Sequence, residues 1–508
     1  MTQPAAAPSI APADVHNQTL LDNVHPPGWV NPQPAPRYNM VVVGAGTAGL
    51  IVAAGAAGLG AKVALIEGEL MGGDCLNFGC VPSKALLRCA RAIADARGAA
   101  AFGAAPPAGT EVDFAAVMER MRRLRAQLSA KDSASRYRAM GVDVFIGAAR
   151  FCGRDSVAVA GHTLYFAHAA IATGTRPAAP PIPGLDKASY LTNETVFSLT
   201  KLPRRLIVIG AGPVGCELAQ AFARFGAQVA LLEAAPGILP QEGRDAAAIV
   251  RDALARDGCE ICEGVKIVEV TPGAGGKRVR LERDAAMSEI EGDEILVAAG
   301  RTPAVEGLDL EAAGVQYDRR TGIKVNDRLQ TTNPRIYAAG DVASAYRFTH
   351  VADATARIVI RNALFRGRQR AGTLIVPWCT YTDPEIAQVG LTEEQARRRG
   401  RIRTFVQPLA DVDRAVLDGE TAGFVKIHVM QGSDRIVGAT IVARHAGEMI
   451  SELTLAMTGG IGLGTIARTI HPYPTQAEAI RKIADAYNRS RLTPRLASLF
   501  RRWLAWTR

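Results

Sequence analysis

Two stretches of the chain show the same succession of apolar and small residues. Residues 40–43 and 206–209 are continuously apolar, which is typical of strands buried on both faces of a parallel sheet. Each stretch leads into a glycine-rich loop, a segment that predicts a helix, and a second apolar strand at residues 62–66 or 229–232. The pattern therefore predicts an α/β fold in which one strand–loop–helix–strand unit occurs twice.

Both units carry the residues of a dinucleotide-binding site. A glycine-rich turn lets the backbone approach a pyrophosphate at the start of a helix, and an acid at the end of the next strand accepts a hydrogen bond from a ribose hydroxyl. The residues concerned are Gly44, Gly46, Gly49 and Glu67 in the first unit, and Gly210, Gly212, Gly215 and Glu233 in the second. Two such units predict two nucleotide cofactors.

The second unit also indicates which nicotinamide nucleotide is used. Glu233 would repel a 2′-phosphate, and no arginine occupies residues 233–236. The sequence therefore predicts NADH, and NADPH remains the alternative because Arg244 follows nearby.

The segments before and after the first strand–loop–helix–strand motif predict further structural elements. Residues 1–36 are rich in Pro and Ala and lack periodicity, so they predict a flexible, partly disordered arm. A basic amphipathic pattern over residues 113–140 predicts one long solvated helix. Apolar runs predict strands at residues 142–146 and 169–172.

The C-terminal part of the chain predicts a separate domain. After Arg370, alternating strands at residues 425–429 and 436–442 are followed by helical segments from Gly447, a pattern typical of an α+β domain. A chain of 508 residues with 48% apolar and 21% charged residues is long enough for three or four globular domains.

A pair of cysteines, Cys75 and Cys80, precedes Lys84 and an apolar segment. The Cα atoms of a disulfide lie roughly 5.5–6 Å apart, whereas helical residues at this spacing lie about 8.6 Å apart. If the cysteines bond, residues 76–79 therefore cannot form regular helix, and Gly79 can relieve the strain. Cys80 would then lie near a helix start, which favours a thiolate. The segment favours a reactive disulfide over a structural bridge or half a zinc site, because no further ligands follow at zinc spacings.

Charge and hydropathy limit the classes of binding partner and the cellular compartments that the sequence indicates. The net charge is +10, but the excess of Lys and Arg lies mostly after residue 481, so it does not indicate nucleic-acid binding. No apolar run is long enough to predict a membrane span, and no signal-peptide pattern opens the chain. We therefore expect a cytoplasmic, reducing compartment, where a disulfide is more often catalytic than structural.

These motifs, with the strand that ends in Gly340-Asp341, resemble the flavin-dependent pyridine nucleotide–disulfide oxidoreductases. That family includes dihydrolipoamide dehydrogenase, glutathione reductase and mercuric reductase. The resemblance covers roughly residues 38–490 and implies two interleaved Rossmann-type domains plus a C-terminal α+β dimerisation domain, and hence a homodimer. The implied parts are a flexible arm (1–36), an FAD domain in two parts (37–185 and 302–370), an NAD(P) domain (186–301), a dimerisation domain (371–490) and a basic tail (491–508).

The resemblance also assigns cofactor contacts. The first glycine motif with Glu67 would hold FAD, and the second with Glu233 would hold the nicotinamide cofactor. Further contacts would come from Thr173, Gly174, Gly340 and Asp341 at FAD, and from Glu217 and Gly300 in the nicotinamide domain.

The same resemblance implies an electron path. Lys84 would lie beside the reactive nitrogen of the flavin, with Glu194 as its partner, because a buried lysine needs a carboxylate. Cys80 would face the flavin and Cys75 would exchange with the acceptor. Electrons would pass from NADH to FAD, then to the disulfide, and then to the acceptor.

The C-terminal domain departs from the disulfide-reducing members, which carry His-Pro-Thr and a nearby Glu as an acid–base pair. Here residues 471–478 read His-Pro-Tyr-Pro-Thr-Gln-Ala-Glu, so Tyr473 takes the histidine position near Glu478. A tyrosine, with a pKa near 10, is a poor base at neutral pH. His471 either swings into the site or is structural. Tyrosine resembles mercuric reductase, although no cysteine follows Cys379 and no N-terminal metal-capturing thiol domain is evident.

The resemblance thus predicts an NADH-dependent flavoenzyme similar to mercuric reductase, whose acceptor is a metal thiolate, a disulfide or a quinone. Dihydrolipoamide dehydrogenase or another disulfide reductase is the alternative enzyme. A membrane-associated, flavin-binding redox sensor or scaffold with little turnover is the alternative of another class.

No resident metal site is predicted from the remaining cysteines. Cys259 and Cys262 fall on a predicted strand, where their spacing is incidental. Cys379 is a spare thiol near the interface region. The other three cysteines lie in apolar or helix-packing segments, where we expect them to pack as small hydrophobic residues; these are Cys89, Cys152 and Cys216.

Residues 494–508 predict an amphipathic helix. Its arginines lie largely away from an apolar face that consists of Leu496, Leu499, Phe500, Trp503 and Leu504. Such a helix either lies on an anionic membrane or covers an apolar patch of its own dimer.

Overall fold

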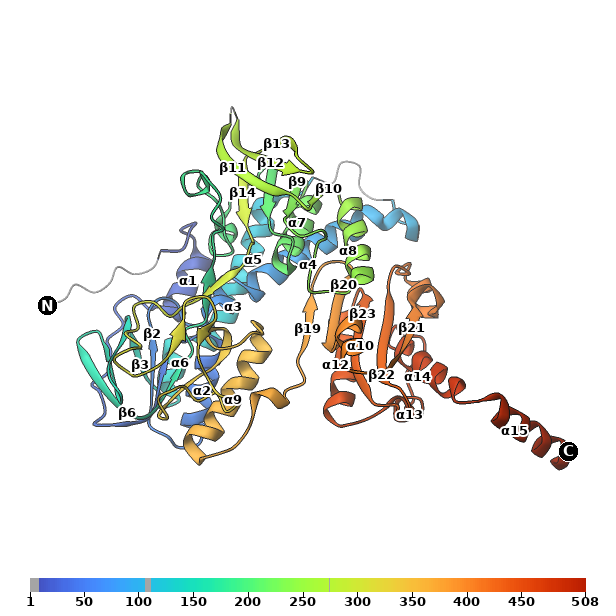
Figure 1. The fold of residues 1–508 in the computed structure, drawn as a ribbon. Coiled ribbons are helices and arrows are strands. Elements are labelled where there is room, and N and C mark those ends of the chain that lie inside the picture. Colours follow the sequence, from blue (N-terminus) through green and yellow to red (C-terminus); the bar gives the residue numbers. More distant parts are fainter. Residues whose placement is uncertain (1–8, 106–110, 274) are drawn as a thin grey trace. The chain divides into compact units, whose positions relative to one another are not determined.

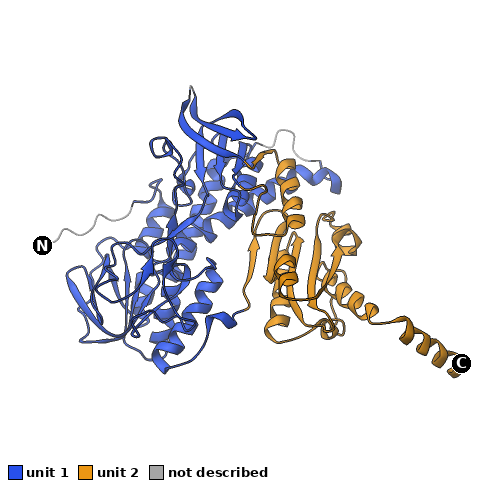
Figure 2. Ribbon diagram, in the orientation of Figure 1, with its two compact units in different colours: residues 1–234, 265–374 blue, residues 235–264, 375–508 orange. Residues whose placement is uncertain are grey.

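The computed structural model describes residues 9–105, 111–273 and 275–508, and these form two compact units (Figures 1 and 2). The first unit combines residues 1–234 with residues 265–374, and the second combines residues 235–264 with residues 375–508. Each unit contains at least one sheet and a hydrophobic core of its own.

The first glycine motif lies in a mostly parallel sheet of the first unit. The strand order is β3-β2-β1-β6-β5-β4, and β18 also pairs with β6. The strands are β1 (Tyr38–Val43), β2 (Val63–Glu67), β3 (Asp143–Ile146), β4 (Ala149–Gly153), β5 (Ser156–Val159), β6 (His162–Ile171) and β18 (Ile336–Ala338). β1 pairs in parallel with both β2 and β6. The apolar run at residues 40–43 is thus a central strand, as its pattern predicts.

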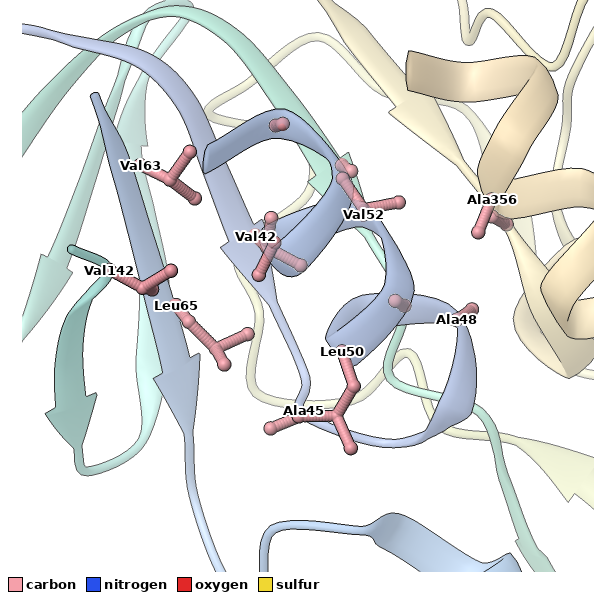
Figure 3. Packing of buried hydrophobic residues seen from close by; sticks show 14 of the residues in the cluster. Val42, Ala45, Ala48, Leu50, Val52, Val63, Leu65, Val142 and Ala356 are labelled. Atoms are coloured by element: carbon pink, nitrogen blue, oxygen red, sulfur yellow. The ribbon is translucent and has the colours of Figure 1, made fainter. Parts of the chain in front are cut away.

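Helices α2 (Thr47–Gly58) and α9 (Thr349–Phe365) contribute to the core beside this sheet. Figure 3 shows Val42 of β1 and Val52 of α2 among the side chains of this core. Both side chains are fully buried, and burial of one such side chain contributes about 1.5–3 kcal/mol. The packing therefore fixes where β1 ends and where α2 begins, and so holds the glycine loop between them.

Within the first unit, the second glycine motif lies among three parallel neighbouring strands in the order β9-β8-β14. Its elements are β8 (Arg205–Ile209), helix α7 (Pro213–Phe225), β9 (Gln228–Glu233) and β14 (Glu294–Val297). The first unit also holds an antiparallel sheet of β11 (Lys266–Gly273), β12 (Gly276–Arg283) and β13 (Ala286–Gly292), and the short pairs β7 (Thr175–Pro177) with β15 (Arg301–Pro303) and β16 (Tyr317–Asp318) with β17 (Gly322–Ile323). The strand–loop–helix–strand unit thus occurs twice, which confirms the predicted α/β fold.

The expected N-terminal arm is partly helical. Helix α1 (Val15–Val24) begins after Asp14, whose side chain accepts a hydrogen bond from the backbone N–H of Asn17. Leu20 and Val24 are fully buried in the core beside the first sheet, so the expectation of a flexible, partly disordered arm is wrong for this segment. Residues 1–8 lie outside the described residues.

The single helix expected over residues 113–140 is two helices, α5 (Phe114–Ser129) and α6 (Ala134–Ala139), with a 3-10 turn between them. The chain restarts at Ser133, whose side chain caps α6. A capping serine satisfies N–H groups at a helix start, so it favours a new helix over a continuous one. Arg122 and Arg125 of α5 are buried, so this face is not solvated as expected.

Residues 375–508 of the second unit combine strands and helices in the α+β manner predicted for the C-terminal part of the chain, and the unit also holds residues 235–264. Its antiparallel sheet has the order β19-β20-β23-β22-β21, with β19 (Pro377–Thr380), β20 (Glu385–Gly390), β21 (Ile402–Pro408), β22 (Phe424–Met430) and β23 (Ile436–Ala443). Its remaining elements are α8 (Arg244–Arg256), β10 (Cys259–Glu263), α10 (Glu393–Arg399), α11 (Asp413–Leu417), α12 (Ala446–Thr458), α13 (Leu463–Ile466), α14 (Glu478–Ser490) and α15 (Pro494–Thr507). Within the described ranges, every helix is too short or too polar to cross a bilayer.

Candidate active site

The cysteine pair lies at a break between two helices of the first unit. Helix α3 (Gly73–Asn77) carries Cys75, and helix α4 (Cys80–Gly98) begins with Cys80. Both cysteines are free thiols here, so the condition of the prediction, a bond between them, is not met. The helix is nevertheless interrupted, at residues 78–79, whereas residues 76 and 77 belong to α3. A Cβ atom at Gly79 would lie 2.9 Å from the carbonyl oxygen of Asp74, so glycine allows the chain to pass closely over α3.

The two cysteines are thiols that share a hydrogen bond, and their environments separate their pKa values. The bond from Cys75, the contact to Thr349 and the charge of Lys84 together lower the pKa of Cys80 to about 6, against the opposing effects of burial and of the charge of Asp74. Cys80 Sγ lies 3.4 Å from Thr349 Oγ1, at the first residue of α9. The same bond, followed by burial, raises the pKa of Cys75. Cys80 is therefore the thiolate at neutral pH, and its place at a helix start favours that form.

The structure corrects the partner of Lys84. Its Nζ donates a hydrogen bond to Glu217 Oε2 at 2.7 Å, and the Glu217 side chain is 5% exposed. The expected pair with Glu194 is wrong: Glu194 instead lies in the field of Arg176, and burial raises its pKa. Lys84 is on α4 and Glu217 is on α7, so this ion pair joins the redox-active helix to the second nucleotide motif.

The two glycine loops have the same geometry. A Cβ atom at Gly49 would lie 1.8 Å from the oxygen of Gly44, and one at Gly215 would lie 1.9 Å from the oxygen of Gly210. No side chain caps the start of α2 or of α7, so their first N–H groups face the loops. Such a close turn onto an uncapped helix start fits a nucleotide pyrophosphate.

The acid that follows each loop is held in the same way. Glu67 Oε2 accepts from the backbone N–H of Ala45 at 2.6 Å, and Glu233 Oε2 accepts from that of Ala211 at 2.7 Å. Burial raises the pKa of Glu67, against the opposing effect of this hydrogen bond. Each carboxylate thus lies beside its glycine loop, as a ribose contact requires.

The other expected FAD contacts gather at one edge of the first sheet. Thr173 and Gly174 follow β6, and Gly340 and Asp341 follow β18, which pairs in parallel with β6. The carboxyl ends of parallel strands meet at the same edge, where such folds bind their ligands. Burial raises the pKa of Asp341, which accepts a hydrogen bond from Thr175 Oγ1 at 3.3 Å. This edge fits FAD, whose ribityl hydroxyls an acid here can bind.

Four residues of this site were not anticipated from the sequence. Arg301 follows Gly300 and pairs with Asp74 at 3.1 Å, and Asn193 Nδ2 donates to the same carboxylate at 2.8 Å. The local signals for three of them are their neighbours in sequence: Asp74 precedes Cys75, Asn193 precedes Glu194 and Arg301 follows Gly300. Thr349, which contacts Cys80, has no local signal.

The expected C-terminal site residues lie in the second unit. The Tyr473 hydroxyl donates to Asp413 Oδ2 at 2.9 Å, which raises the tyrosine pKa. The side chain of His471 is 6% exposed, and its ring nitrogens contact Glu452 Oε1 at 2.9 Å and the backbone oxygen of Thr469 at 3.0 Å. Because both ring nitrogens already have hydrogen-bond partners, the arrangement favours a structural role for His471.

The structure also places Glu478 and the other cysteines that the sequence analysis names. Glu478 opens α14 and is buried, and its Oε2 has no hydrogen-bond partner within the described chain. Cys216 is buried, but Cys152 is exposed on β4, so the expected apolar environment is wrong for Cys152. Cys379 is half-buried, with Sγ 4.0 Å from Glu385 Oε2. Among the described residues, no cluster of His, Cys, Asp and Glu is arranged to hold a metal ion.

Known proteins match this chain over most of its length. Residues 38–356 match the family described as pyridine nucleotide-disulphide oxidoreductase, and residues 376–484 match the dimerisation domain of that family. A mercuric reductase of Lysinibacillus sphaericus is 35% identical over 453 residues, which are 89% of this chain and 83% of that protein. A dihydrolipoyl dehydrogenase of Thermus scotoductus is 36% identical over 465 residues, which are 89% of this chain and 98% of that protein.

A solved structure agrees with the fold. The Cu(II) complex of the HOCl-induced flavoprotein disulfide reductase RclA from Escherichia coli has a TM-score of 0.79 at 29% identity, and covers 89% of this chain and 100% of that chain. Members of the matched family contain FAD and take electrons from NAD(P)H. The paired thiols, the two nucleotide loops and these matches agree: this chain belongs to the pyridine nucleotide–disulphide oxidoreductase family.

Proposed function

We propose that this oxidoreductase passes electrons from NAD(P)H through Cys75 and Cys80 to a thiophilic metal ion or its thiolate complex. The observation that carries the proposal is the placement of the thiol pair: Cys80 is the first residue of α4, with its Sγ 3.4 Å from Thr349 Oγ1, and Cys75 lies on α3. These surroundings lower the pKa of Cys80 and raise that of Cys75, which favours one thiolate beside one thiol. Thiolates are the ligands that soft metal ions prefer. Two relatives support this acceptor class, since one is named for mercury and another is described as a Cu(II) complex.

The chain's own residues prepare the thiols for this task. Bound FAD supplies two-electron exchange between a nicotinamide and a disulfide. Thr349 and Cys75 hold Cys80 as the thiolate, and the ammonium of Lys84 stabilises negative charge at that position. Glu217 in turn fixes the ammonium at 2.7 Å.

The net reaction balances with mercury as the acceptor. One NAD(P)H gives up two electrons, Hg(II) takes both, and the products are NAD(P)⁺, one proton and Hg(0). With Cu(II), the same two electrons reduce two ions to Cu(I). With the free ions, neither reaction releases a leaving group that needs a proton. When Hg(II) arrives as a complex with two thiolates, reduction to Hg(0) releases both thiolates, and these take up the proton from NAD(P)H and one proton from solvent.

A disulfide acceptor differs in this respect, because its leaving thiolate needs a proton from a general acid. Tyr473 stands at the position where the resemblance places that acid, and its hydrogen bond to Asp413 raises its pKa above the ordinary value. His471 is engaged at both nitrogens. Lipoamide reduction is therefore the second candidate, favoured by the likeness to dihydrolipoyl dehydrogenase.

The test is steady-state NADH and NADPH oxidation with Hg(II) bound to a small thiol, Cu(II), lipoamide, glutathione disulfide and quinones. We expect the metal ions to give the highest kcat/KM, and Cys75→Ala to abolish that turnover. The matched control is Cys152→Ala, because Cys152 is an exposed thiol that lies on β4, away from the pair. Ferricyanide, which a flavin reduces without thiols, should serve all variants equally. Equal rates for every acceptor in Cys75→Ala would overturn the proposal.

We also propose that the enzyme is a homodimer that works in a reducing compartment and contacts an anionic membrane through α15. The matched dimerisation domain supports the dimer. No residue of α15 is buried, and its apolar face lies 37–62% exposed from Leu496 to Leu504. Arg495, Arg501 and Arg502 are exposed on the same helix, and it carries no carboxylate side chain, so its charge complements anionic lipid.

Co-sedimentation with vesicles tests the membrane contact. We expect binding to vesicles that contain phosphatidylglycerol, little binding to phosphatidylcholine alone, and loss of binding in the double variant Leu499→Ser, Trp503→Ser. If that variant instead binds normally but shifts the dimer to monomer, α15 covers its own dimer. Binding without turnover on any acceptor would favour a membrane-associated sensor or scaffold.

A further inference from the structure

The N-terminal segment lies outside the range that matches the family, yet it is anchored to the redox-active segment. The match begins at residue 38, whereas α1 and the residues after it belong to the first unit. The backbone N–H of Met71, two residues before α3, donates to the oxygen of Val24 at 3.1 Å. A ring nitrogen of His25 contacts the backbone oxygen of Glu69. The end of α1 is therefore tied to the chain that enters α3.

A buried arginine makes a second connection, from α1 to the end of α3. Arg125 of α5 is 1% exposed. One terminal nitrogen donates to Asn17 Oδ1 at 2.7 Å, and the other donates to the backbone oxygen of Asn77 at 2.8 Å. Asn77 is the last residue of α3, which carries Cys75. The last carbonyls of a helix have no partner within it, and the planar guanidinium can serve two acceptors at once.

The two asparagines extend the network, in which only Arg125 Nε and Asn77 Oδ1 have no hydrogen-bond partner among the described residues. Asn17 is 1% exposed and donates its amide nitrogen to the oxygen of Pro12 at 2.7 Å, so its oxygen faces Arg125. Asn77 is fully buried and donates to the oxygens of Met71 and Gly73 at 3.0 and 2.9 Å. A continuous chain of hydrogen bonds thus runs from α1 through the guanidinium to both ends of α3.

We propose that Asn17 and Arg125 are positioning residues for the redox-active pair, which hold the end of α3 and thereby the place of Cys75 beside Cys80. An arginine buried to this degree is costly unless its donors are matched, and Asn17 supplies one of the matches. This inference rests on one part of the proposed function, namely that Cys75 and Cys80 are the redox pair. It gives a role to a segment that the matched family domain does not include.

The test uses the reduced holoenzyme and measures the rate at which iodoacetamide alkylates Cys80, as a function of pH and by mass spectrometry. We expect Asn17→Ala to misplace Cys75, to weaken its hydrogen bond to Cys80, and to move the alkylation midpoint upward. At pH 5 the rate should fall about threefold to tenfold, because one pKa unit changes the thiolate fraction about tenfold there. Ferricyanide reduction, which needs no thiols, should not change.

The matched control is Asn23→Ala. It removes a hydrogen bond of 2.9 Å from α1 to Ser129 of α5, and this bond does not involve α3. Asn17→Asp keeps an acceptor oxygen for Arg125 and should restore the midpoint. Arg125→Lys keeps the charge but not the two-armed geometry, and should behave as Asn17→Ala does.

Three results would overturn the proposal. The first is an equal shift of the alkylation midpoint in Asn17→Ala and Asn23→Ala. The second is no shift in either variant. The third is a midpoint in Arg125→Lys that equals the wild-type value. Alkylation needs no electron acceptor, so a chain that reduces no metal ion can still show the Asn17 effect. Failure of the proposed function and failure of this inference are therefore distinguishable.

Discussion

Removal of the positive charge of Lys84 is expected to raise the pKa of Cys80 from about 6 to about 7. The perturbation is Lys84→Met, which keeps the length of the side chain on α4 but not its ammonium. The charge of Lys84 is one of three influences that lower this pKa, beside the hydrogen bonds from Cys75 and Thr349. Those two hydrogen bonds remain in the variant, so only part of the depression should be lost.

The structure sets the size of the effect. Lys84 follows Cys80 by one helical turn, which places their Cβ atoms about 5–6 Å apart. Two unit charges about 7 Å apart interact by about 2.4 kcal/mol at an effective dielectric constant of about 20. The Lys84 side chain is 36% exposed and paired with Glu217, so we take about half of that value. About 1.2 kcal/mol corresponds to a pKa change of about 1.

The assay is the ultraviolet absorbance of the Cys80 thiolate against pH in the reduced protein. The spectrum of Cys80→Ser is subtracted, so that the difference reports this thiol alone. Glu217→Gln provides a control of opposite sign, because it leaves the ammonium but removes its carboxylate, and should move the midpoint below 6. Arg88→Met removes an exposed charge one turn farther along α4 and should have little effect. FAD content and circular dichroism confirm that each variant is folded.

The reasoning fails if Lys84→Met titrates at about 6 as the wild type does. It also fails if Glu217→Gln moves the midpoint upward, since the ammonium would then not be the source of the field at Cys80.

Three further predictions concern other residues. Burial lowers the pKa of His428 to about 4, so the unfolded chain binds a proton that the folded chain does not between pH 6.5 and 4. Stability should therefore fall by about 3 kcal/mol as the pH falls through that range, and His428→Leu should remove most of this dependence in urea titrations; an unchanged slope would contradict it. Tyr473→His should raise dihydrolipoamide oxidation by about tenfold to hundredfold, because an imidazole near Glu478 can take the thiol proton, and no gain would argue against an acid–base role there. Glu233→Arg should raise the NADPH/NADH ratio of kcat/KM, because arginine pairs with a 2′-phosphate that the carboxylate repels; a constant ratio would exclude Glu233 from this choice.

Much of the fold and part of the site follow from local sequence. The two glycine loops, with Glu67 and Glu233, are recognisable because strand, turn and acid are close together along the chain. The cysteine spacing likewise predicts a helix break that the structure places at residues 78–79. Each of these inferences depends on chain geometry over a few residues.

The rest depends on which helices pack together, and no local pattern specifies this. Lys84 meets Glu217 rather than Glu194 because α4 packs on α7, which joins residues far apart in sequence. The role of Arg125 was hidden because a basic amphipathic pattern resembles a solvated face. One weak signal for α1 was present: Asp14 precedes a helical spacing of Leu20 and Val24, but the surrounding Pro and Ala favoured an arm.

The two nucleotide loops also provide an internal reference for experiments on either one. The interval from Gly44 to Gly210 equals that from Glu67 to Glu233, so neither copy has gained or lost a residue between its first glycine and its acid. Each carboxylate receives the same backbone N–H in its own copy. A substitution in one copy therefore has an equivalent, unaltered position in the same molecule. The same substitution made at Glu67 and at Glu233 would show how the loss of the carboxylate affects each of the two nucleotide sites in an equivalent backbone setting.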